Sequence, residues 1–290
     1  MILLTQVLIH FGFLKALDIP TALNNLQFAL LAFATLCIAA AGYIINNLND
    51  IDGDRINKPD RVYIPKPFSE TQAFNIYLIF NIAGVGLGFV LSYMMGLTNF
   101  ATFFVLVSAL LYVYANFLKR VLIIGNLVVS MVVAAAIFIV ILYDMVPLLE
   151  GYSNELMTPI LILRDYALFA LMLNFLREIV KDIEDANGDY SVGINSLPIL
   201  IGLERTAKIS AYIAVVYIFT ILGYIYFWLQ TNVWTSIYLV TAVVVPLVYF
   251  CIKARYADKK THYSHLSFVL KLIMLSGILS LGVLTLTLKF

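Results

Sequence analysis

The chain has 290 residues, of which 62% are hydrophobic and 12% are charged, with a formal net charge of +1. Soluble domains average roughly 45–50% apolar and 25% charged residues, so this composition excludes an ordinary soluble protein and indicates a protein with several membrane spans. The charge balance gives no sign of nucleic-acid binding. Cys37 and Cys251 both lie inside apolar runs, where each is expected to act as a small buried hydrophobe, and no disulfide framework is expected.

Nine apolar runs follow one another, most of them close to the ~20 residues that a spanning helix needs. They cover residues 1–14, 24–46, 72–95, 97–116, 121–143, 159–180, 207–229, 233–252 and 266–288. We therefore predict an all-α polytopic membrane protein with nine transmembrane helices. Because no linker or loop approaches domain size, we predict one transmembrane domain over residues 1–290. The first run ends at Lys15 and would span only about 21 Å of a ~30 Å core, so we expect a truncated first helix.

Lys and Arg residues indicate the orientation, because they favour cytoplasmic loops. Of the 18 such residues, 14 lie at or after the ends of the second, fourth, sixth and eighth runs. We therefore expect the N-terminus and these loops to face the cytoplasm and the C-terminus to lie outside the cell membrane.

The second run continues into a polar segment at residues 46–54. Residues four apart lie on one face of a helix, so Asn46, Asp50 and Asp54 form a single stripe of side-chain oxygens. An ionised group at bilayer depth costs at least ~2.5 kcal/mol, which makes these carboxylates functional candidates. Ordinary solvated loop acids are the alternative, but the regular spacing favours a bound cation.

Basic residues that are expected on the same side of the membrane follow this stripe in the sequence. Arg61 lies in the next loop, and Lys119 and Arg120 end the fourth run. We predict that Arg61 and Lys119 help to bind a diphosphate, although the rule that places positive charge inside accounts for such residues as well. In the third run, the spacing of Gly84 and Gly88 is typical of a small-residue face for helix packing.

The longest outer loop, at residues 144–158, carries three acidic residues, Asp144, Glu150 and Glu155. Their sign and their expected exposure are typical of a solvated loop. We assign them no role.

A second acidic segment begins where the sixth run ends. Asp185 and Asp189 repeat the four-residue spacing, and Asp182, one turn earlier, extends the stripe. Mg²⁺ takes oxygen ligands and commonly uses only one or two carboxylates, completing its shell with water and substrate phosphate. Two facing stripes therefore predict Mg²⁺ bound around one diphosphate. The predicted metal ligands are Asn46, Asp50, Asp54, Asp185 and Asp189.

Polar residues also lie just before the second stripe. Arg177 and Lys181 are one turn apart, and the forked guanidinium of Arg177 suits a phosphate or a carboxylate. Asn174 lies one turn before Arg177, and Asn126 follows Gly125. Hydrogen bonds between helices are the simplest explanation for both asparagines, but Asn174 is kept as a substrate-binding candidate with Arg177 and Lys181.

The paired motifs resemble those of the UbiA superfamily of intramembrane prenyltransferases, Asn-x-x-x-Asp-x-x-x-Asp and Asp-x-x-x-Asp, and the resemblance covers essentially the whole chain. It implies an all-α bundle, Mg²⁺, a prenyl diphosphate donor and a lateral opening to lipid. Residues 177–189 are most similar to the digeranylgeranylglyceryl phosphate synthase branch. Asn47 stands where the family often has Asp, and the family's Arg and Asn near the start of the first helix are missing.

The resemblance implies transfer of a geranylgeranyl group to geranylgeranylglyceryl phosphate, with Lys66 binding the acceptor phosphate. The loop at residues 58–66 lacks the Pro-x-Pro-Ser-Gly of many quinone-pathway members, which favours this acceptor. The candidate catalytic residues are Asp50, Asp54, Asp185, Asp189 and Asp182, the last as a proton acceptor or as a group that orients others.

Two alternatives stay open. One is prenylation of an aromatic acceptor of the 4-hydroxybenzoate or 1,4-dihydroxy-2-naphthoate type. The other is a membrane transporter, although transporters place their carboxylates near the bilayer midplane, whereas these stripes begin at helix ends. No obligate protein partner is expected.

Overall fold

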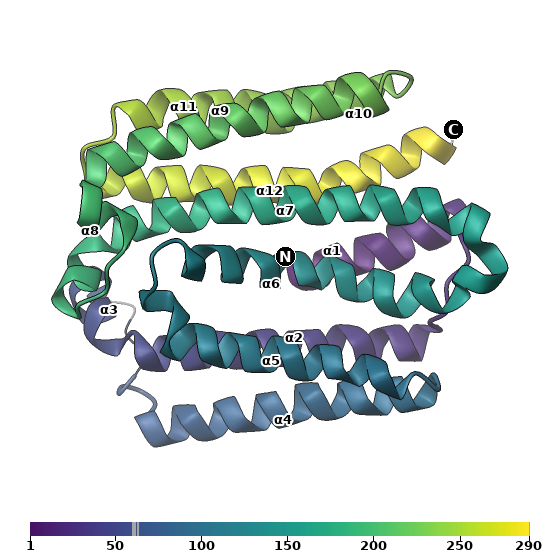
Figure 1. Cartoon of the computed structure of the whole chain (residues 1–290), viewed down its shortest axis with the longest axis horizontal. Coiled ribbons are helices and arrows are strands. Elements are labelled where there is room, and N and C mark those ends of the chain that lie inside the picture. The colour runs from purple at the N-terminus through teal and green to yellow at the C-terminus, as the bar shows by residue number, and fades with distance from the viewer. Residues whose placement is uncertain (60–61, 63, 290) are drawn as a thin grey trace.

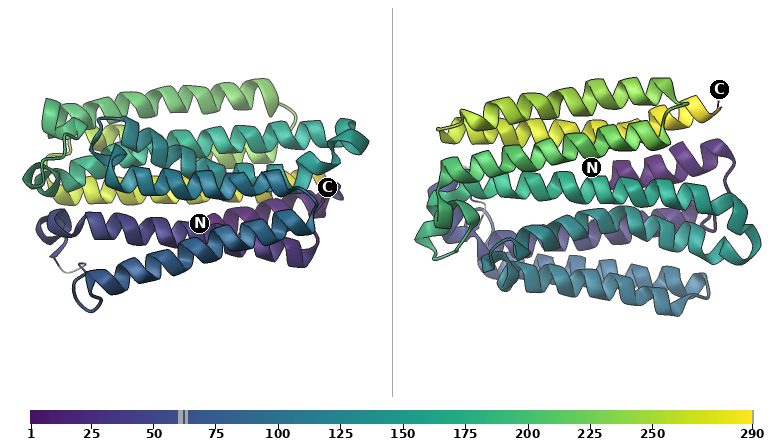
Figure 2. Two further views of the ribbon diagram at one scale, coloured as in Figure 1. Left: turned by 60° about the horizontal axis from the view of Figure 1, so that its bottom comes forward. Right: turned by 45° about the horizontal axis from the view of Figure 1, so that its top comes forward.

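A computed structural model describes residues 1–59, 62 and 64–289 of the chain. These residues form helices and their connections, and no β-strand occurs among them. The long helices run along a common direction, with α4 at one edge of the bundle and α9 and α11 at the opposite edge (Figures 1 and 2). The fold is therefore all-α, as the composition predicts.

The helices have the following bounds in chain order. They are α1 (Ile2–Val7), α2 (Asn25–Asn49), α3 (Ile51–Asn57), α4 (Glu70–Met94), α5 (Ala101–Asn116), α6 (Ile124–Val140), α7 (Leu149–Ser191), α8 (Leu197–Ile201), α9 (Leu203–Trp228), α10 (Val233–Leu239), α11 (Val245–Arg255) and α12 (Lys260–Lys289). Short π-helical segments extend α1 and α6 and join α10 to α11.

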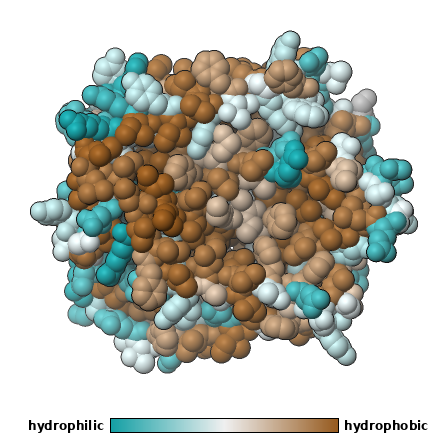
Figure 3. All heavy atoms as spheres, viewed as in Figure 1, coloured by the Kyte–Doolittle hydropathy of each residue, from teal (hydrophilic) through white to brown (hydrophobic). Residues whose placement is uncertain are grey.

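Seven helical stretches among the described residues are long and apolar enough to cross a membrane. One of them, residues 124–191, contains both α6 and α7, which pack against each other. Apolar side chains cover most of the visible face in Figure 3, and hydrophilic ones gather towards the helix ends. The chain is thus an integral membrane protein. The count of nine spans and a truncated first helix stay predictions, as does the single domain.

Helix caps determine where α2 and α4 begin, and small residues determine how closely α4 packs against its neighbours. Asn24 and Ser69 begin α2 and α4, each in a reciprocal pair of hydrogen bonds with the residue three positions later. A Cβ on Gly84 would lie 2.6 Å from Ile38 of α2, and one on Gly88 would collide with Phe104 of α5. The predicted small-residue packing face is confirmed, and it allows α4 to approach both neighbours closely.

The expectation that Asp144 is a solvated loop acid is wrong. Its side chain is fully buried, pairs with His10 Nδ1 and accepts a hydrogen bond of 3.0 Å from the backbone N–H of Leu23. The helical turns after α6 continue to Met145 and carry the carboxylate into the bundle, where these donors satisfy it. The negative charge of Asp144 and its place in a predicted loop therefore did not indicate whether its side chain is buried.

The predicted orientation can be tested with two exposed positions at opposite ends of α7. In a chain whose own cysteines are replaced by alanine, a cysteine at Asn187 should react only with a reagent on the cytoplasmic side, and one at Asn154 only with a reagent outside. The reason is the bias of Lys and Arg towards one set of loops. Labelling with a membrane-impermeant maleimide in intact and in opened cells measures this. Labelling of both positions from one side would contradict the assignment.

Candidate active site

The two acidic segments meet at one end of the bundle, where α3 crosses the last turns of α7. Asn57 is buried and holds them together, because its amide donates to the carbonyl of Asp185 at 2.7 Å and accepts from the N–H of Gly188 at 3.0 Å. A Cβ on Gly188 would lie 2.5 Å from the carbonyl of Gly53. Glycine at position 188 is therefore needed for this approach of the two helices.

Lysines neutralise the central carboxylate of each stripe. Asp50 Oδ2 accepts a hydrogen bond of 2.7 Å from Asn46 Nδ2, as expected for neighbours on one stripe, and it also pairs with Lys119. Asp185 pairs with Lys58, whose Nζ lies 2.7 Å from Oδ1 and donates to Oδ2 at 2.9 Å. Lys58 was not among the residues predicted from the sequence, although it continues the four-residue spacing after Asp54.

The remaining carboxylates make this end of the bundle strongly acidic. Burial raises the pKa of the Asp54 carboxyl above its ordinary value, and the nearby Asp50 carboxylate raises it further. Asp182, Asp185 and Asp189 line one pocket together. The concentration of negative charge favours the binding of cations here.

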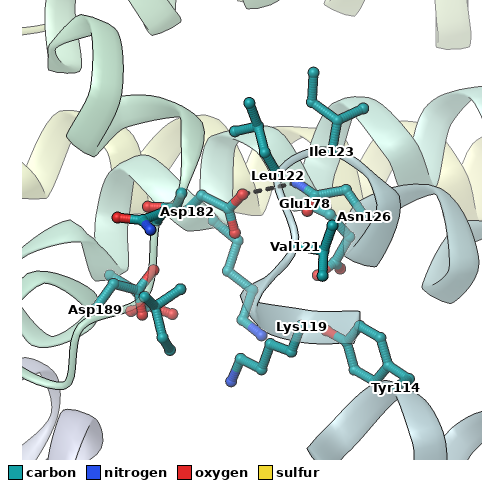
Figure 4. Close-up of a pocket in the computed structure, with 14 residues that line it drawn as sticks. Tyr114, Lys119, Val121, Leu122, Ile123, Asn126, Glu178, Asp182 and Asp189 are labelled. Atoms are coloured by element: carbon teal, nitrogen blue, oxygen red, sulfur yellow. Dashed lines mark hydrogen bonds between the residues drawn. The ribbon is translucent and has the colours of Figure 1, made fainter. Parts of the chain in front are cut away.

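This polar pocket is formed by α5, the turn after it, α6, α7 and the segment that follows α7. In Figure 4, Asp182 and Asp189 lie on the α7 side, and Lys119 and Tyr114 lie towards α5. The lining residues with polar side chains are Tyr114, Lys119, Asn126, Glu178, Lys181, Asp182, Asp185, Asp189, Asn195 and Ser196. A pocket with carboxylates and two lysines can hold an anion together with its metal counter-ions.

Two asparagines join α6 to α7, as the sequence analysis expected. Asn126 Nδ2 donates to Asp182 Oδ2 at 2.7 Å, and Asn174 Nδ2 donates to Ser130 Oγ at 3.3 Å. The first bond fixes the Asp182 carboxylate at the wall of the polar pocket. Asn174 does not line the polar pocket but lines a second, apolar cavity.

This apolar cavity has a volume of about 280 Å³, close to the lower end of the roughly 300–1,000 Å³ that is typical of ligand pockets. Side chains of α1, α6, α7, α9 and α12 line it. Arg177 lies at its wall and pairs with Glu178 at 2.8 Å, and Glu178 lines the polar pocket. One ion pair thus separates a polar pocket from an apolar cavity.

The other predicted site residues are placed as follows. Lys66 lies on an exposed turn and lines neither the polar pocket nor the apolar cavity. Arg61 lies outside the described residues. Lys58, Tyr114 and Glu178 were missed by the sequence analysis, and only Lys58 had a signal in its spacing.

The donor atoms fit Mg²⁺ that shares its ligands with a substrate. No group of three or more Asp, Glu, His or Cys side chains within the described part of the chain is arranged to hold an ion alone. Asn46 Oδ1 is buried and receives no hydrogen bond from any described residue. Asp185 Oδ1 is also buried, and the ammonium group of Lys58 lies 2.7 Å from it. The first stripe therefore has a free oxygen acceptor, and water with phosphate would complete the shell of a hard cation.

Comparisons with known proteins show the family to which the chain belongs. The sequence model of the UbiA prenyltransferase family matches residues 8–278. A digeranylgeranylglyceryl phosphate synthase of Methanobrevibacter smithii is 32% identical over 285 residues, covering 95% of this chain and 90% of that protein. One of Sulfurisphaera tokodaii is 33% identical over 184 residues, and there the match covers 63% of this chain but only 60% of the relative.

Two solved structures share the fold. One, described as a digeranylgeranylglyceryl phosphate synthase in membranes, is 25% identical, with a TM-score of 0.62 and coverage of 96% of this chain and 92% of that one. The other, a UbiA homologue from Aeropyrum pernix K1 without bound ligand, is 16% identical, with a TM-score of 0.70 and coverage of 95% and 96%. The second likeness concerns the fold alone.

Proposed function

This chain belongs to the UbiA prenyltransferase family, and from that premise we propose that it transfers a geranylgeranyl group from its diphosphate to geranylgeranylglyceryl phosphate in a Mg²⁺-dependent reaction. Membership of the family makes it an enzyme of prenyl transfer rather than a transporter. The observation that carries the proposal is the polar pocket next to the apolar cavity, because a prenyl diphosphate has one polar and one apolar end.

The two stripes would hold the donor's diphosphate group through the metal. The proposed ligands are Asn46, Asp50, Asp54, Asp185 and Asp189. When bound, Mg²⁺ would neutralise the charge that grows on the diphosphate as the allylic C–O bond breaks. Lys119 and Lys181 line the polar pocket together with Asp185 and Asp189 and would donate to phosphate oxygens, and we assign the same role to Arg61.

The allylic carbon then forms a bond to the hydroxyl oxygen of the acceptor, and that hydroxyl loses its proton. We assign the proton to Asp182, because this carboxylate lines the pocket and Asn126 fixes its position. Arg177 and Asn174 would face the prenyl chain in the apolar cavity. The mostly apolar lining of this cavity would disfavour water near the cationic carbon and so limit its hydrolysis.

The acceptor assignment is supported by the similarity to digeranylgeranylglyceryl phosphate synthases and is tested by a product analysis. Purified protein in lipid nanodiscs is incubated with radiolabelled geranylgeranyl diphosphate, Mg²⁺ and a panel of acceptors. We expect the label in a digeranylgeranylglyceryl phosphate. Efficient labelling of a hydroxybenzoate or dihydroxynaphthoate instead would overturn the acceptor and leave prenyl transfer intact.

Replacing Lys66 by alanine should raise the KM for geranylgeranylglyceryl phosphate about fivefold, because an exposed ion pair contributes up to ~1 kcal/mol. The KM for the donor should change little, since Lys66 lies away from the polar pocket. Steady-state kinetics with each substrate varied in turn measures this. The exposed Lys208 is the matched control, and its alanine variant should leave both KM values unchanged. An unchanged acceptor KM in the Lys66 variant would remove this residue from the site.

A further inference from the structure

Lys58 links the two acidic stripes. It follows α3 one turn after Asp54, and its ammonium group faces both carboxylate oxygens of Asp185 on α7, at 2.7 and 2.9 Å. Only 26% of the Lys58 side chain and 14% of the Asp185 side chain are exposed, so solvent screens this pair weakly. The ammonium group of Lys58, which follows the first stripe in the chain, therefore lies beside the central carboxylate of the second stripe.

The second lysine pair is arranged differently. At Asp50, both Asn46 and Lys119 contact Oδ2, which leaves Oδ1 available to another ligand. At Asp185, the ammonium of Lys58 lies beside both oxygens, although only Oδ2 receives a well-aligned hydrogen bond. A metal ion can thus reach Asp50 with Lys119 in place, but at Asp185 it would meet a second positive charge at close range.

We propose that Lys58 is a built-in competitor of the metal, a counter-cation that pairs with Asp185 and must withdraw before Asp185 can bind an ion. The proposal rests on the proposed function, which makes Asp185 a metal ligand. The flexible four-carbon stem of lysine permits the withdrawal, and an arriving diphosphate offers the released ammonium a new anionic partner. Metal binding at Asp185 is then weak until the diphosphate is present.

The test measures the binding of Mn²⁺, without any diphosphate, to the full chain in nanodiscs by the electron paramagnetic resonance signal of free Mn²⁺. Lys58→Met should bind Mn²⁺ at least about tenfold more tightly than the wild type, because a competing charge is gone. Lys58→Arg keeps the charge and should bind within about twofold of the wild type. Arg55→Met is the matched control, because Arg55 lies on the same helix in an exposed pair with Asp52, and it should also stay within about twofold.

Equal or weaker Mn²⁺ binding by Lys58→Met than by the wild type would overturn the proposal, provided that both elute alike in gel filtration. Should the methionine variant not fold, Lys58→Gln replaces it with the same expectation. Binding by neither variant nor wild type, while transfer still requires Mg²⁺, would also overturn it. Failure of the proposed function would give a different result, because the wild type would then transfer prenyl groups at an unchanged rate in EDTA.

Discussion

Asp50→Ala is expected to reduce prenyl transfer by about 10²- to 10³-fold, the effect of removing one group that stabilises charge in a transition state. Asp50 lies at the centre of the first stripe, where it accepts from Asn46 and pairs with Lys119. Its loss would remove a proposed ligand of Mg²⁺ and release a cation that is held towards the pocket. The rate of formation of labelled product at saturating donor and Mg²⁺ measures the effect.

Two further variants separate charge from folding. Asp50→Asn keeps the shape of the side chain without its charge, and it should lose nearly as much activity as the alanine variant. Asp52 lies two positions away but is 77% exposed and pairs only with Arg55 among described residues, so Asp52→Ala should retain near-normal activity. EDTA should reproduce the loss in the wild type. Normal turnover by Asp50→Ala at low Mg²⁺ would refute the two-stripe site.

Gly277→Phe is expected to lower kcat/KM for geranylgeranyl diphosphate by about tenfold or more, because a single methylene in an apolar pocket already changes discrimination by about 10- to 200-fold. Gly277 lines the apolar cavity, and no atom lies within 4 Å of a Cβ built on it. The phenylalanine side chain can therefore enter the cavity without a clash at its Cβ atom. Donors with shorter chains should be affected less, so the preferred donor length should decrease.

Gly223→Phe provides the comparison at a site outside the cavity. This glycine lies on α9, also has no atom within 4 Å of a built Cβ, and does not line the cavity. The phenylalanine variant should keep the donor preference of the wild type. A rise in the acceptor KM of Gly277→Phe without any change in donor length would show that the cavity holds the acceptor chain instead.

The amino-acid sequence by itself determined that the protein is an all-α integral membrane protein. Long apolar runs predict spanning helices because the bilayer offers no partners for unpaired backbone groups, so the signal is local and strong. The four-residue spacing likewise placed Asn46 and Asp50 on one face of a helix, where the structure shows them in contact. Both patterns depend only on residues within a few turns of each other.

Tertiary structure alone decided which distant groups meet. Asn57 and Lys58 join residues of α7 that lie about 130 positions further along the chain, and no local pattern encodes such a pairing. The same holds for Asp144, whose buried partner His10 lies 134 positions earlier in the chain, and for the apolar cavity, whose lining comes from helices along the whole chain. Periodicity gives the face of a helix but not the register or the neighbour against which that face packs, because these depend on side-chain fit across the whole bundle.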